Sequence, residues 1–358
     1  MKGLILAGGL ATRLRPLSYT GPKQLIPIAN KPVLHYIIED LCNAGITDIG
    51  IIVGYTEERI NAIKESLGKG EKWGVNITYI EQDAPRGLAH AVGIAEGFMG
   101  GDDFVVYLGD NIIKSGIKSM VSEFNENSYD AMLLLAESDT PEKFGVVHVK
   151  NKQIIDLEEK PENPKSNLVI TGVYIFKPTL FEKIRLVKPG KKGELQLTDA
   201  IRLLVHSSNH KVSYKLIEDW WDDTGTAESV LRANYLLLTD LRTKIEGTID
   251  QSVKMLGHIK VEKGTVIKEN CVMKGPIIIG QNCQIGPNTY IGPYTSIGNN
   301  TTIKKGEIES SVILNDVYID FNEKIVDSLI GENVKIISQE SLPKGHKFLL
   351  GKSSEVKL

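Results

Sequence analysis

Cysteine is scarce in this sequence: Cys42, Cys271 and Cys283 are the only ones, and none belongs to a Cys-x-x-Cys pair. An odd number without this spacing argues against a disulfide framework and a zinc site, and it favours a reducing cytoplasm. Long hydrophobic runs are also absent, since none approaches the roughly 18 residues that a membrane helix requires. The apolar start is soon followed by Arg13 and Arg15, so it predicts a strand and not a signal peptide. We therefore expect a cytoplasmic protein with no membrane partner.

An excess of positive charge is missing as well. Lys and Arg number 42 against 45 Asp and Glu, for a formal net charge of −3. A protein that binds nucleic acid through its whole surface is usually strongly basic, so we expect no nucleic-acid partner. Aromatic residues make up only 6% of the chain and hydrophobic residues 41%, so the cores should be ordered and mainly aliphatic. A length of 358 residues predicts about two domains.

Short apolar runs alternate with helical patterns in residues 1–240. The expected strands are Gly3–Ala7, Asp48–Val53, Val75–Glu81 and Phe104–Leu108, and the expected helices are Pro32–Ala44, Glu57–Leu67 and Leu88–Phe98. Continuous apolar strands separated by helices are typical of a Rossmann-like α/β domain, with a mostly parallel sheet covered on both faces. Ligands of such sheets bind beyond the carboxyl ends of the strands.

A different period governs the rest of the chain. Aliphatic residues recur every six positions, at Val261, Ile267, Met273, Ile279, Ile285, Ile291, Ile297 and Ile303. A hexapeptide period is the signature of a β-helix, in which one apolar residue per face points inward and Gly or Asn turns the corners. The period slips after Ile303 and resumes at Ile313, which indicates a four-residue insertion.

These patterns predict two domains of unequal size: an α/β domain over 1–240 and a β-helix over 241–348, followed by a tail over 349–358. The repeats resemble the left-handed parallel β-helix of hexapeptide-repeat proteins. Its open ends and flat faces favour self-association, so we expect a homo-oligomer.

The first 38 residues contain five basic side chains and no acidic one: Lys2, Arg13, Arg15, Lys23 and Lys31. Gly8 and Gly9 follow the first expected strand, so backbone N–H groups there can point at an anion. The segment contains neither a P-loop nor a G-x-G-x-x-G motif. It is interpreted as a phosphate-binding loop of another kind, although a solvated basic loop would also explain the charge.

The segment Leu6–Pro27 resembles the signature of sugar-1-phosphate nucleotidylyltransferases, G-G-x-G-T-R-L-x-P-x-T followed by P-K and a later Pro. The matching residues are Gly8, Gly9, Thr12, Arg13, Leu14, Pro16, Pro22, Lys23 and Pro27. The sequence after Lys23, Gln-Leu-Ile-Pro, is most similar to the glucose-1-phosphate thymidylyltransferase branch, whose long form carries a short β-helix. Ala11 stands where the family usually has Gly. We expect φ < 0 there, because φ > 0 would cost alanine about 1 kcal/mol.

The resemblance implies further nucleotide and metal contacts. The implied nucleotide-binding residues are Leu6, Gly8, Gly9, Thr12, Arg13, Gln24, Gln82, Pro85, Gly87 and Asp110. A Gln amide such as that of Gln82 can pair with the imide edge of a base. Asp110 and Asp223 match the carboxylates that hold Mg²⁺ in the family, whereas Asp222 lies outside the match. Mg²⁺ is commonly bound by one or two carboxylates together with substrate phosphates. Taken alone, residues 82–88 read as a turn before a helix and Asp110 as a helix cap.

A second group of matches concerns the sugar phosphate. The implied sugar-phosphate contacts are Gly145, Glu159, Lys160, Thr171, Gly172, Glu194 and Trp221. In Glu-Glu-Lys-Pro, Lys160 would hold the phosphate and Glu159 a sugar hydroxyl, although such a run alone is usually a solvated surface. Phe144 stands where thymidylyltransferases often have Tyr, so only the backbone contact of Gly145 is carried over.

The implied reaction joins dTTP to glucose 1-phosphate and releases pyrophosphate. A phosphate oxygen of the sugar attacks the α-phosphorus in line and is already ionised, so no general base is needed. The obstacle is repulsion, since two unit charges about 4 Å apart cost about 4 kcal/mol at an effective dielectric of about 20. The implied catalytic residues are Arg13, Lys23, Asp110, Lys160 and Asp223, with Mg²⁺ as the cofactor.

Three other interpretations stay open. The first is an enzyme that uses UTP or several nucleotides. Uracil differs from thymine by one methyl group, and a contact to that group is worth only about 1–3 kcal/mol. An acetyltransferase activity in the β-helix would need a catalytic His, and only His258 and His346 lie beyond residue 245. A non-catalytic regulatory subunit would be expected to have lost the charged residues that this sequence retains.

Overall fold

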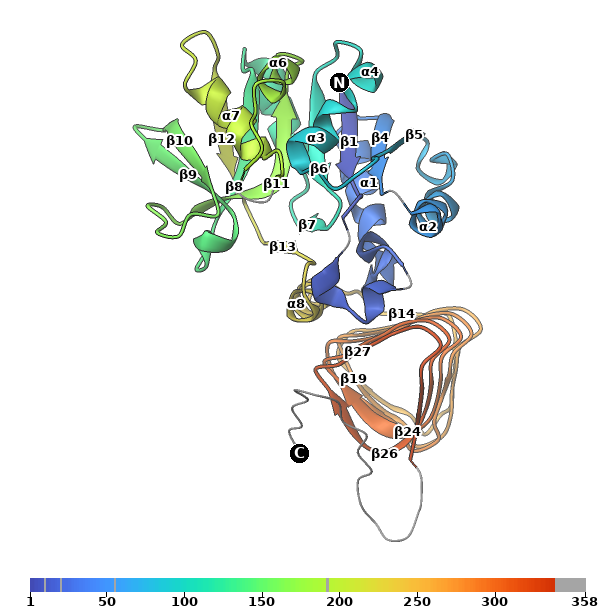
Figure 1. The fold of residues 1–358 in the computed structure, drawn as a ribbon. Coiled ribbons are helices and arrows are strands. Elements are labelled where there is room, and N and C mark those ends of the chain that lie inside the picture. Colours follow the sequence, from blue (N-terminus) through green and yellow to red (C-terminus); the bar gives the residue numbers. More distant parts are fainter. Residues whose placement is uncertain (10, 20, 55, 191–192, 339–358) are drawn as a thin grey trace, which may run out of the picture. The chain divides into compact units, whose positions relative to one another are not determined.

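A computed structural model describes residues 1–338 except 10, 20, 55, 191 and 192. The chain divides into two compact units, Met1–Asp240 and Leu241–Leu358 (Figure 1). The expected tail, 349–358, lies outside the described residues. No described helix has the length and hydropathy needed to cross a membrane.

The first unit is built on a nine-stranded mixed sheet with the order β10-β9-β11-β6-β1-β4-β5, and β8 and β12 continue it from β11. The strands are β1 (Lys2–Leu6), β4 (Asp48–Val53), β5 (Asn76–Glu81), β6 (Phe104–Leu108), β8 (Ala131–Glu137), β9 (Gly145–Lys150), β10 (Gln153–Glu159), β11 (Leu168–Phe176) and β12 (Val212–Leu216). The four strands expected from the sequence form one parallel part, β6-β1-β4-β5, and β12 also pairs in parallel with β8. The α/β fold with parallel strands is therefore confirmed, and β11 adds an antiparallel strand beside β6.

Helices cover the faces of this sheet (Figure 1). They are α1 (Val33–Asn43), α2 (Glu57–Leu67), α3 (Leu88–Gly93), α4 (Glu96–Met99), α5 (Lys118–Glu126), α6 (Leu180–Ile184), α7 (Leu197–Val205) and α8 (Ala227–Leu238). Two short ribbons complete the unit: β2 (Pro27–Ile28) with β3 (Lys31–Pro32), and β7 (Asn111–Ile113) with β13 (Trp221–Asp223).

The single helix expected over Leu88–Phe98 is wrong, because α3 and α4 are separate. At the break, Ala95 N donates to Val92 O at 3.0 Å, a bond three residues back that tightens the turn. A Cβ on Gly93 would lie 3.3 Å from Ile184 Cγ2, so α6 packs closely against the end of α3. The hydrophobic period of the sequence does not predict such a break.

Asp40 is an acidic residue on α1 that faces the fully buried Tyr107 of β6. The Tyr107 hydroxyl donates a hydrogen bond to Asp40 Oδ2 at 3.0 Å. Burial raises the pKa of Asp40 from 3.8 to about 7, although the Tyr107 hydrogen bond opposes this rise. Because folding raises the pKa of Asp40, the protonated carboxyl contributes stability that is fully present below the unfolded-state pKa of 3.8. That contribution is lost as the pH rises through about 7.

The replacement Asp40→Asn should therefore stabilise the protein at pH 8 by about 2 kcal/mol, and by much less at pH 4. The amide oxygen can still accept from Tyr107 while the buried charge is removed. Denaturant unfolding of both proteins at the two pH values measures this difference. Burial lowers the pKa of His35 to about 4, but this effect is common to both proteins and cancels. An equal loss of stability at both pH values would contradict the prediction.

The second unit is a parallel β-helix whose three faces enclose an apolar core, and Figure 1 shows its triangular cross-section. One face contains β14 (Lys244–Ile245), β17 (Ile259–Val261), β20 (Ile277–Ile279), β23 (Thr295–Ile297), β25 (Val312–Ile313) and β27 (Leu329–Ile330). The next contains β15 (Thr248–Ile249), β18 (Val266–Ile267), β21 (Gln284–Ile285), the first parts of β24 (Thr302–Glu309) and β26 (Tyr318–Val326), and β28 (Lys335–Ile337). The third contains β16 (Lys254–Leu256), β19 (Val272–Lys274), β22 (Tyr290–Ile291) and the last parts of β24 and β26.

The β-helix that the hexapeptide period predicts is thus confirmed, and its repeating aliphatic residues are buried. Most corners are turned by residues with positive φ, such as Asn282 and Asn300. The glycines that follow the repeat residues have another cause. A Cβ on Gly280 would lie 2.4 Å from Asn299 Oδ1, and one on Gly298 would lie 2.6 Å from the Leu314 backbone. Close approach of the next coil therefore requires glycine at these positions.

The four-residue insertion expected after Ile303 is wrong. Ile308 is fully buried and pairs with Ile291 and Ile325 of the neighbouring coils, so it is a core residue of the repeat. The two steps from Ile303 to Ile308 and from Ile308 to Ile313 are each five residues long instead of six. The six-residue period is therefore interrupted by two steps that are each one residue short, and not by an insertion.

Candidate active site

The parallel strands of the first unit end at one edge of the sheet, and several expected site residues follow them there. Gly8 lies two residues after β1, Gln82 directly after β5, and Asp110 two residues after β6. Leu6 itself is the last residue of β1 and is buried. This is the edge at which open α/β sheets bind their ligands.

Two glycines let the chain segments at this edge approach one another. A Cβ on Gly8 would lie 2.8 Å from Gln82 Oε1, and one on Gly109 would lie 2.8 Å from Leu6 O. By contrast, no atom of the described residues outside its chain neighbours lies within 4 Å of the Cβ position of Gly9. Of the two glycines after β1, Gly8 thus serves packing.

The loop after β1 contains a residue whose conformation the sequence did not predict. Ala11 has φ 52° and ψ 44°, so the expectation of φ < 0 is wrong. Its carbonyl oxygen accepts hydrogen bonds from Ser18 Oγ at 2.7 Å and Leu14 N at 3.1 Å. Arg59 of α2 also donates to Ser18 O at 2.6 Å and to Gly9 O at 3.3 Å. These bonds offset the cost of about 1 kcal/mol that a left-handed conformation imposes on alanine.

Lys23 and Asp110 form an ion pair between Nζ and Oδ2. Their side chains are only 11% and 21% exposed, and Asn111 Nδ2 also donates to Asp110 Oδ1 at 2.8 Å. Burial by itself would raise the pKa of Asp110, but the charge and the hydrogen bond of Lys23 outweigh it and hold the pKa below its ordinary value. Asp110 is therefore ionised at neutral pH.

Asp223 reaches the same place from a distant part of the sequence. The ribbon β7–β13 pairs it with Asn111, and Thr224 N and Oγ1 donate to Asp110 O at 2.8 Å and 2.9 Å. A Cβ on Gly225 would lie 2.9 Å from Arg13 Nη2 and 3.4 Å from Asp223 Oδ2. The glycine after Thr224 therefore leaves space for the Arg13 guanidinium beside this carboxylate.

The two carboxylates fit the donor set that Mg²⁺ prefers. Burial raises the pKa of Asp223 and the negative charge of Asp110 raises it further, although the positive charges of Arg13 and Lys23 oppose this rise. Among the described residues, no cluster of three or more His, Cys, Asp or Glu could hold a metal ion. A magnesium site here would thus depend on two carboxylates and on substrate oxygens.

Asp222 plays a different part from its neighbour. It is buried, and its two oxygens accept hydrogen bonds from Arg232 Nε at 2.6 Å and Nη2 at 2.7 Å. Burial raises the pKa of Asp222 to about 6 despite this pairing. The side chain is committed to α8, and the expectation that only the second aspartate of the pair serves the site stays a prediction.

Gln82 and Gly87, which are expected to bind the base, each lie against another residue of the first unit. Gln82 is buried, and its Nε2 lies 3.2 Å from His90 Nδ1. Gly87 has φ 98°, and a Cβ there would lie 2.4 Å from Leu195 O, so this turn contacts the segment that contains Glu194. Gln24 is buried too, and its Oε1 has no hydrogen-bond partner among the described residues. Pro85 and Thr12 are exposed.

The residues expected to bind the sugar phosphate lie mainly on β9, β10 and β11. Glu159 Oε2 accepts from Thr198 Oγ1 at 2.7 Å, and its Oε1 lies 3.3 Å from Lys160 Nζ. A Cβ on Gly145 would lie 3.3 Å from Glu159 Oε2, which explains the glycine. The Lys160 side chain is 63% exposed, so its ammonium is accessible to a ligand.

Asn111 connects this group to the carboxylates. Trp221 Nε1 donates to Asn111 Oδ1 at 2.5 Å, and a Cβ on Gly172 would lie 3.0 Å from Asn111 Nδ2. The Thr171 hydroxyl is already used, since it donates to Leu134 O at 3.0 Å. Glu194 accepts a hydrogen bond from Gln196 Nε2 at 3.2 Å.

Sequence reasoning missed several supporting residues. Asn111 directly follows Asp110 and could have been found from that position. Arg59 and Thr198 carry no signal in the sequence, because their partners are 41 and 39 residues away. Such contacts are created only when separate elements pack together.

Comparison with protein families identifies both units. Residues 2–240 match the family model described as nucleotidyl transferase, and residues 273–357 match the one described as GMPPB C-terminal domain.

Two curated relatives align over the full length of the chain. The low-salt glycan biosynthesis nucleotidyltransferase Agl11 of Haloferax volcanii is 42% identical over 360 residues, covering 100% of both chains. A glucose-1-phosphate thymidylyltransferase of Streptomyces antibioticus is also 42% identical, covering 100% of this chain and 99% of its own. Among solved structures, a protein of Bacillus anthracis described as a glucose-1-phosphate thymidylyltransferase is 39% identical with a TM-score of 0.62. That match covers 68% of this chain and 98% of the other.

Proposed function

The chain belongs to the nucleotidyl transferase family, and from this premise we propose that it transfers a thymidylyl group from dTTP to glucose 1-phosphate. The products would be dTDP-glucose and pyrophosphate. The family membership and the full-length relatives support a nucleotidyltransferase of the sugar-1-phosphate type. The observation that carries the proposal is the grouping of Lys23, Asp110, Asp223 and Arg13 at the carboxyl edge of the sheet.

This grouping suits a reaction between two polyanions. An oxygen of the sugar phosphate forms a bond to the α-phosphorus, and the bond from that phosphorus to the pyrophosphate oxygen breaks. Arg13 offers a forked pair of donors to phosphate oxygens, and Lys23 offers a point charge. Such fixed charges are effective because they need no rearrangement as charge moves toward the leaving group. No described residue needs to remove a proton from the nucleophile.

Asp110 and Asp223 would hold Mg²⁺, and the ion when bound would supply positive charge beside the substrate phosphates. The raised pKa of Asp223 supports this role, because a carboxylate whose ionised form is disfavoured by burial and by the charge of Asp110 gains from a nearby cation. Asn111 and Thr224 keep the two segments in register around Asp110.

The sugar end of the site would use Lys160 and Glu159. Lys160 has an exposed ammonium suited to a phosphate, and Glu159 is held by Thr198 so that a carboxylate oxygen can accept from a sugar hydroxyl. The contacts that position Gly145 and Gly172 bring the backbone close to this region. Glucose is favoured by the names of the relatives and by the branch signature after Lys23.

The choice of dTTP rests on the same signature and on Gln82. The buried amide of Gln82 offers both a donor and an acceptor, which can pair with the imide edge that thymine and uracil share. The methyl group separates these two bases by about 1–3 kcal/mol, and UTP is therefore the main competitor.

Pyrophosphate release tests the proposal directly. The full-length protein with Mg²⁺ would be assayed with dTTP, UTP, ATP and GTP against glucose, glucosamine and mannose 1-phosphates. We expect the highest kcat/KM for dTTP with glucose 1-phosphate, and roughly tenfold less for UTP. A higher value with UTP would overturn the proposed nucleotide, and no release with any pair would favour a regulatory subunit. An added acetyl-CoA assay would reveal an acetyltransferase in the β-helix.

A further inference from the structure

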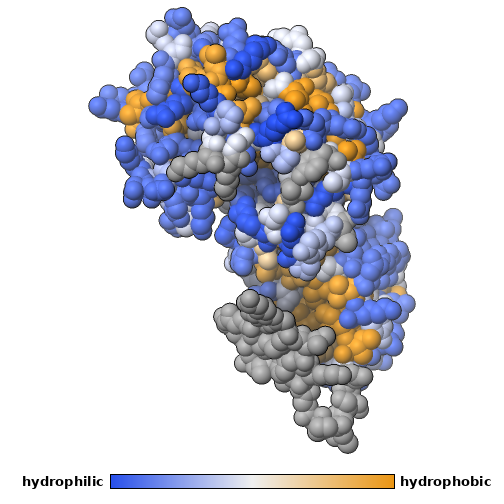
Figure 2. Space-filling view, viewed as in Figure 1, coloured by the Kyte–Doolittle hydropathy of each residue, from blue (hydrophilic) through white to orange (hydrophobic). Residues whose placement is uncertain are grey.

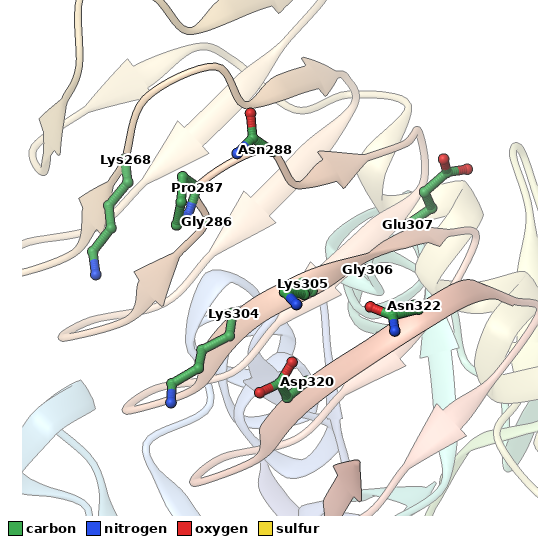
Figure 3. Close-up of a pocket in the computed structure, with 10 residues that line it drawn as sticks. All are labelled: Lys268, Gly286, Pro287, Asn288, Lys304, Lys305, Gly306, Glu307, Asp320 and Asn322. Atoms are coloured by element: carbon green, nitrogen blue, oxygen red, sulfur yellow. The ribbon is translucent and has the colours of Figure 1, made fainter. Parts of the chain in front are cut away.

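A cavity of about 500 Å³ is hollowed into one corner of the β-helix, within the second unit (Figure 3). This volume lies in the range of about 300–1,000 Å³ that is usual for small-molecule sites. Its lining residues come from four successive coils: Lys268, Gly286, Pro287, Asn288, Lys304, Lys305, Gly306, Glu307, Asp320 and Asn322.

The cavity arises where the coils change their path around the corner. The first two coils turn there at Asn270 and Asn288, with φ 58° and 55°. The next two cross the corner as the continuous strands β24 and β26, whose pairing shifts in register around Lys305. Because the step from Ile303 to Ile308 is one residue short, the third coil lacks the corner residue of the second. The hollow therefore results from the path of the backbone and not only from the positions of flexible side chains.

Three lysines line this hollow, and the described residues show no ion pair for any of them. Elsewhere on the β-helix, Lys260 pairs with Glu262 at 2.9 Å and Lys324 with Glu309 at 2.8 Å. Within the described part of the chain, by contrast, Lys268, Lys304 and Lys305 form no ion pair. The Lys304 ammonium lies 5.4 Å from the centroid of the Tyr318 ring, which limits the positions of its side chain.

The charges of the lining are also segregated. Figure 3 shows the side chains of Lys268 and Lys304 extending in the same direction, whereas Glu307 lies at the opposite end. Asp320 lies near Lys304 and is also the register partner of Lys305, so it offsets part of both charges and leaves Lys268 the least compensated. The end of the cavity at Lys268 and Lys304 is thus more positive than the end at Glu307.

We propose that this cavity binds a small molecule that carries a diphosphate group. A diphosphate holds several negative charges over two adjacent phosphates, so it can contact separate point charges such as these lysines. The concave shape and the size favour a small ligand over a nucleic acid or a protein surface. The proposal does not depend on the reaction proposed for the first unit.

Hydrogen exchange of the full-length protein, followed by mass spectrometry, tests the site. The probes are inorganic pyrophosphate and ADP, each added without divalent metal ions. We expect slower exchange in peptides that cover 302–309 and 318–326, and peptides from residues 1–240 report binding at the first unit separately. Stronger protection by ADP would identify a nucleoside diphosphate as the ligand, and stronger protection by pyrophosphate the inorganic anion.

Two variants make the test specific. The double variant Lys304→Ala/Lys305→Ala should weaken the affinity for the probe by at least about tenfold, because each lysine contributes a charge-assisted contact. Lys274→Ala is the matched control: its ammonium lies 5.6 Å from the Tyr290 ring centroid, in the manner of Lys304 and Tyr318, but outside the cavity. It should leave the affinity unchanged. Equal protection in the double variant, an equal loss in the control, or protection confined to residues 1–240 would overturn the proposal.

Discussion

Replacing Asp110 with Asn should lower the turnover number by at least about a hundredfold, which corresponds to about 2.7 kcal/mol of transition-state stabilisation. The amide keeps the size of the side chain but removes the negative charge that faces Lys23 and that would hold Mg²⁺. Steady-state pyrophosphate release at saturating substrates measures the effect. The Mg²⁺ concentration that gives half the maximal rate should also rise, which a purely structural defect would not produce.

Asp222→Asn is the control for this experiment. Asp222 is as buried as a site residue and lies next to Asp223, but it pairs with Arg232 on α8. We expect a lower melting temperature in this variant and a turnover number within about threefold of the wild type, because the change removes a structural pairing and no substrate contact. Near-normal turnover in Asp110→Asn, with the folded state intact, would remove Asp110 from the catalytic group.

Replacing Lys23 with Ala should also reduce turnover by at least about a hundredfold, since it removes a fixed positive charge beside the reacting phosphates. The structure adds a second consequence. Without Lys23, burial becomes the dominant influence on Asp110 and raises the pKa of that carboxyl, so the ionised form is less favourable. The variant therefore impairs two groups, and its effect should be larger in kcat than in KM for either substrate.

A control and a double variant define the role of Lys23. Lys31→Ala removes another lysine of the same acid-free segment, one that pairs with Glu39 at 2.6 Å, and it should leave turnover within about twofold because surface pairs contribute little. Because Lys23 and Asp110 are in contact, the loss in Lys23→Ala/Asp110→Asn should be clearly smaller than the product of the single losses. Fully multiplicative losses would mean that the two residues act independently of their ion pair.

Local sequence patterns predicted the main elements because those patterns follow from burial. The strands Asp48–Val53 and Phe104–Leu108 and the helix Glu57–Leu67 have the bounds that were expected, since each is bordered by a clear change in hydrophobic period. The hexapeptide period likewise predicted the β-helix, because every sixth residue must point into one narrow core. The glycines and charged residues of the segment after β1 similarly indicated a phosphate-binding chemistry.

Other features depend on groups that are distant in the sequence. The positive φ of Ala11 is held by Ser18 and Arg59, and the break between α3 and α4 lies where α6 packs against Gly93. The six-residue period did not predict that Ile308 is a core residue, because its position in the core depends on its neighbours in adjacent coils. The sequence shows that these residues are present, but it does not show which distant residues they contact.

The sequence by itself therefore determined the two-unit architecture, the family resemblance and the residues expected to carry the chemistry. Only the tertiary structure decided how those residues act on one another. Lys23 pairs with Asp110 across 87 positions, and Asp223 comes to the same place on the ribbon β7–β13, whereas its neighbour Asp222 turns to Arg232. The physical reason is that composition and period specify what each segment buries, but charges interact through distances that exist only after the segments have packed.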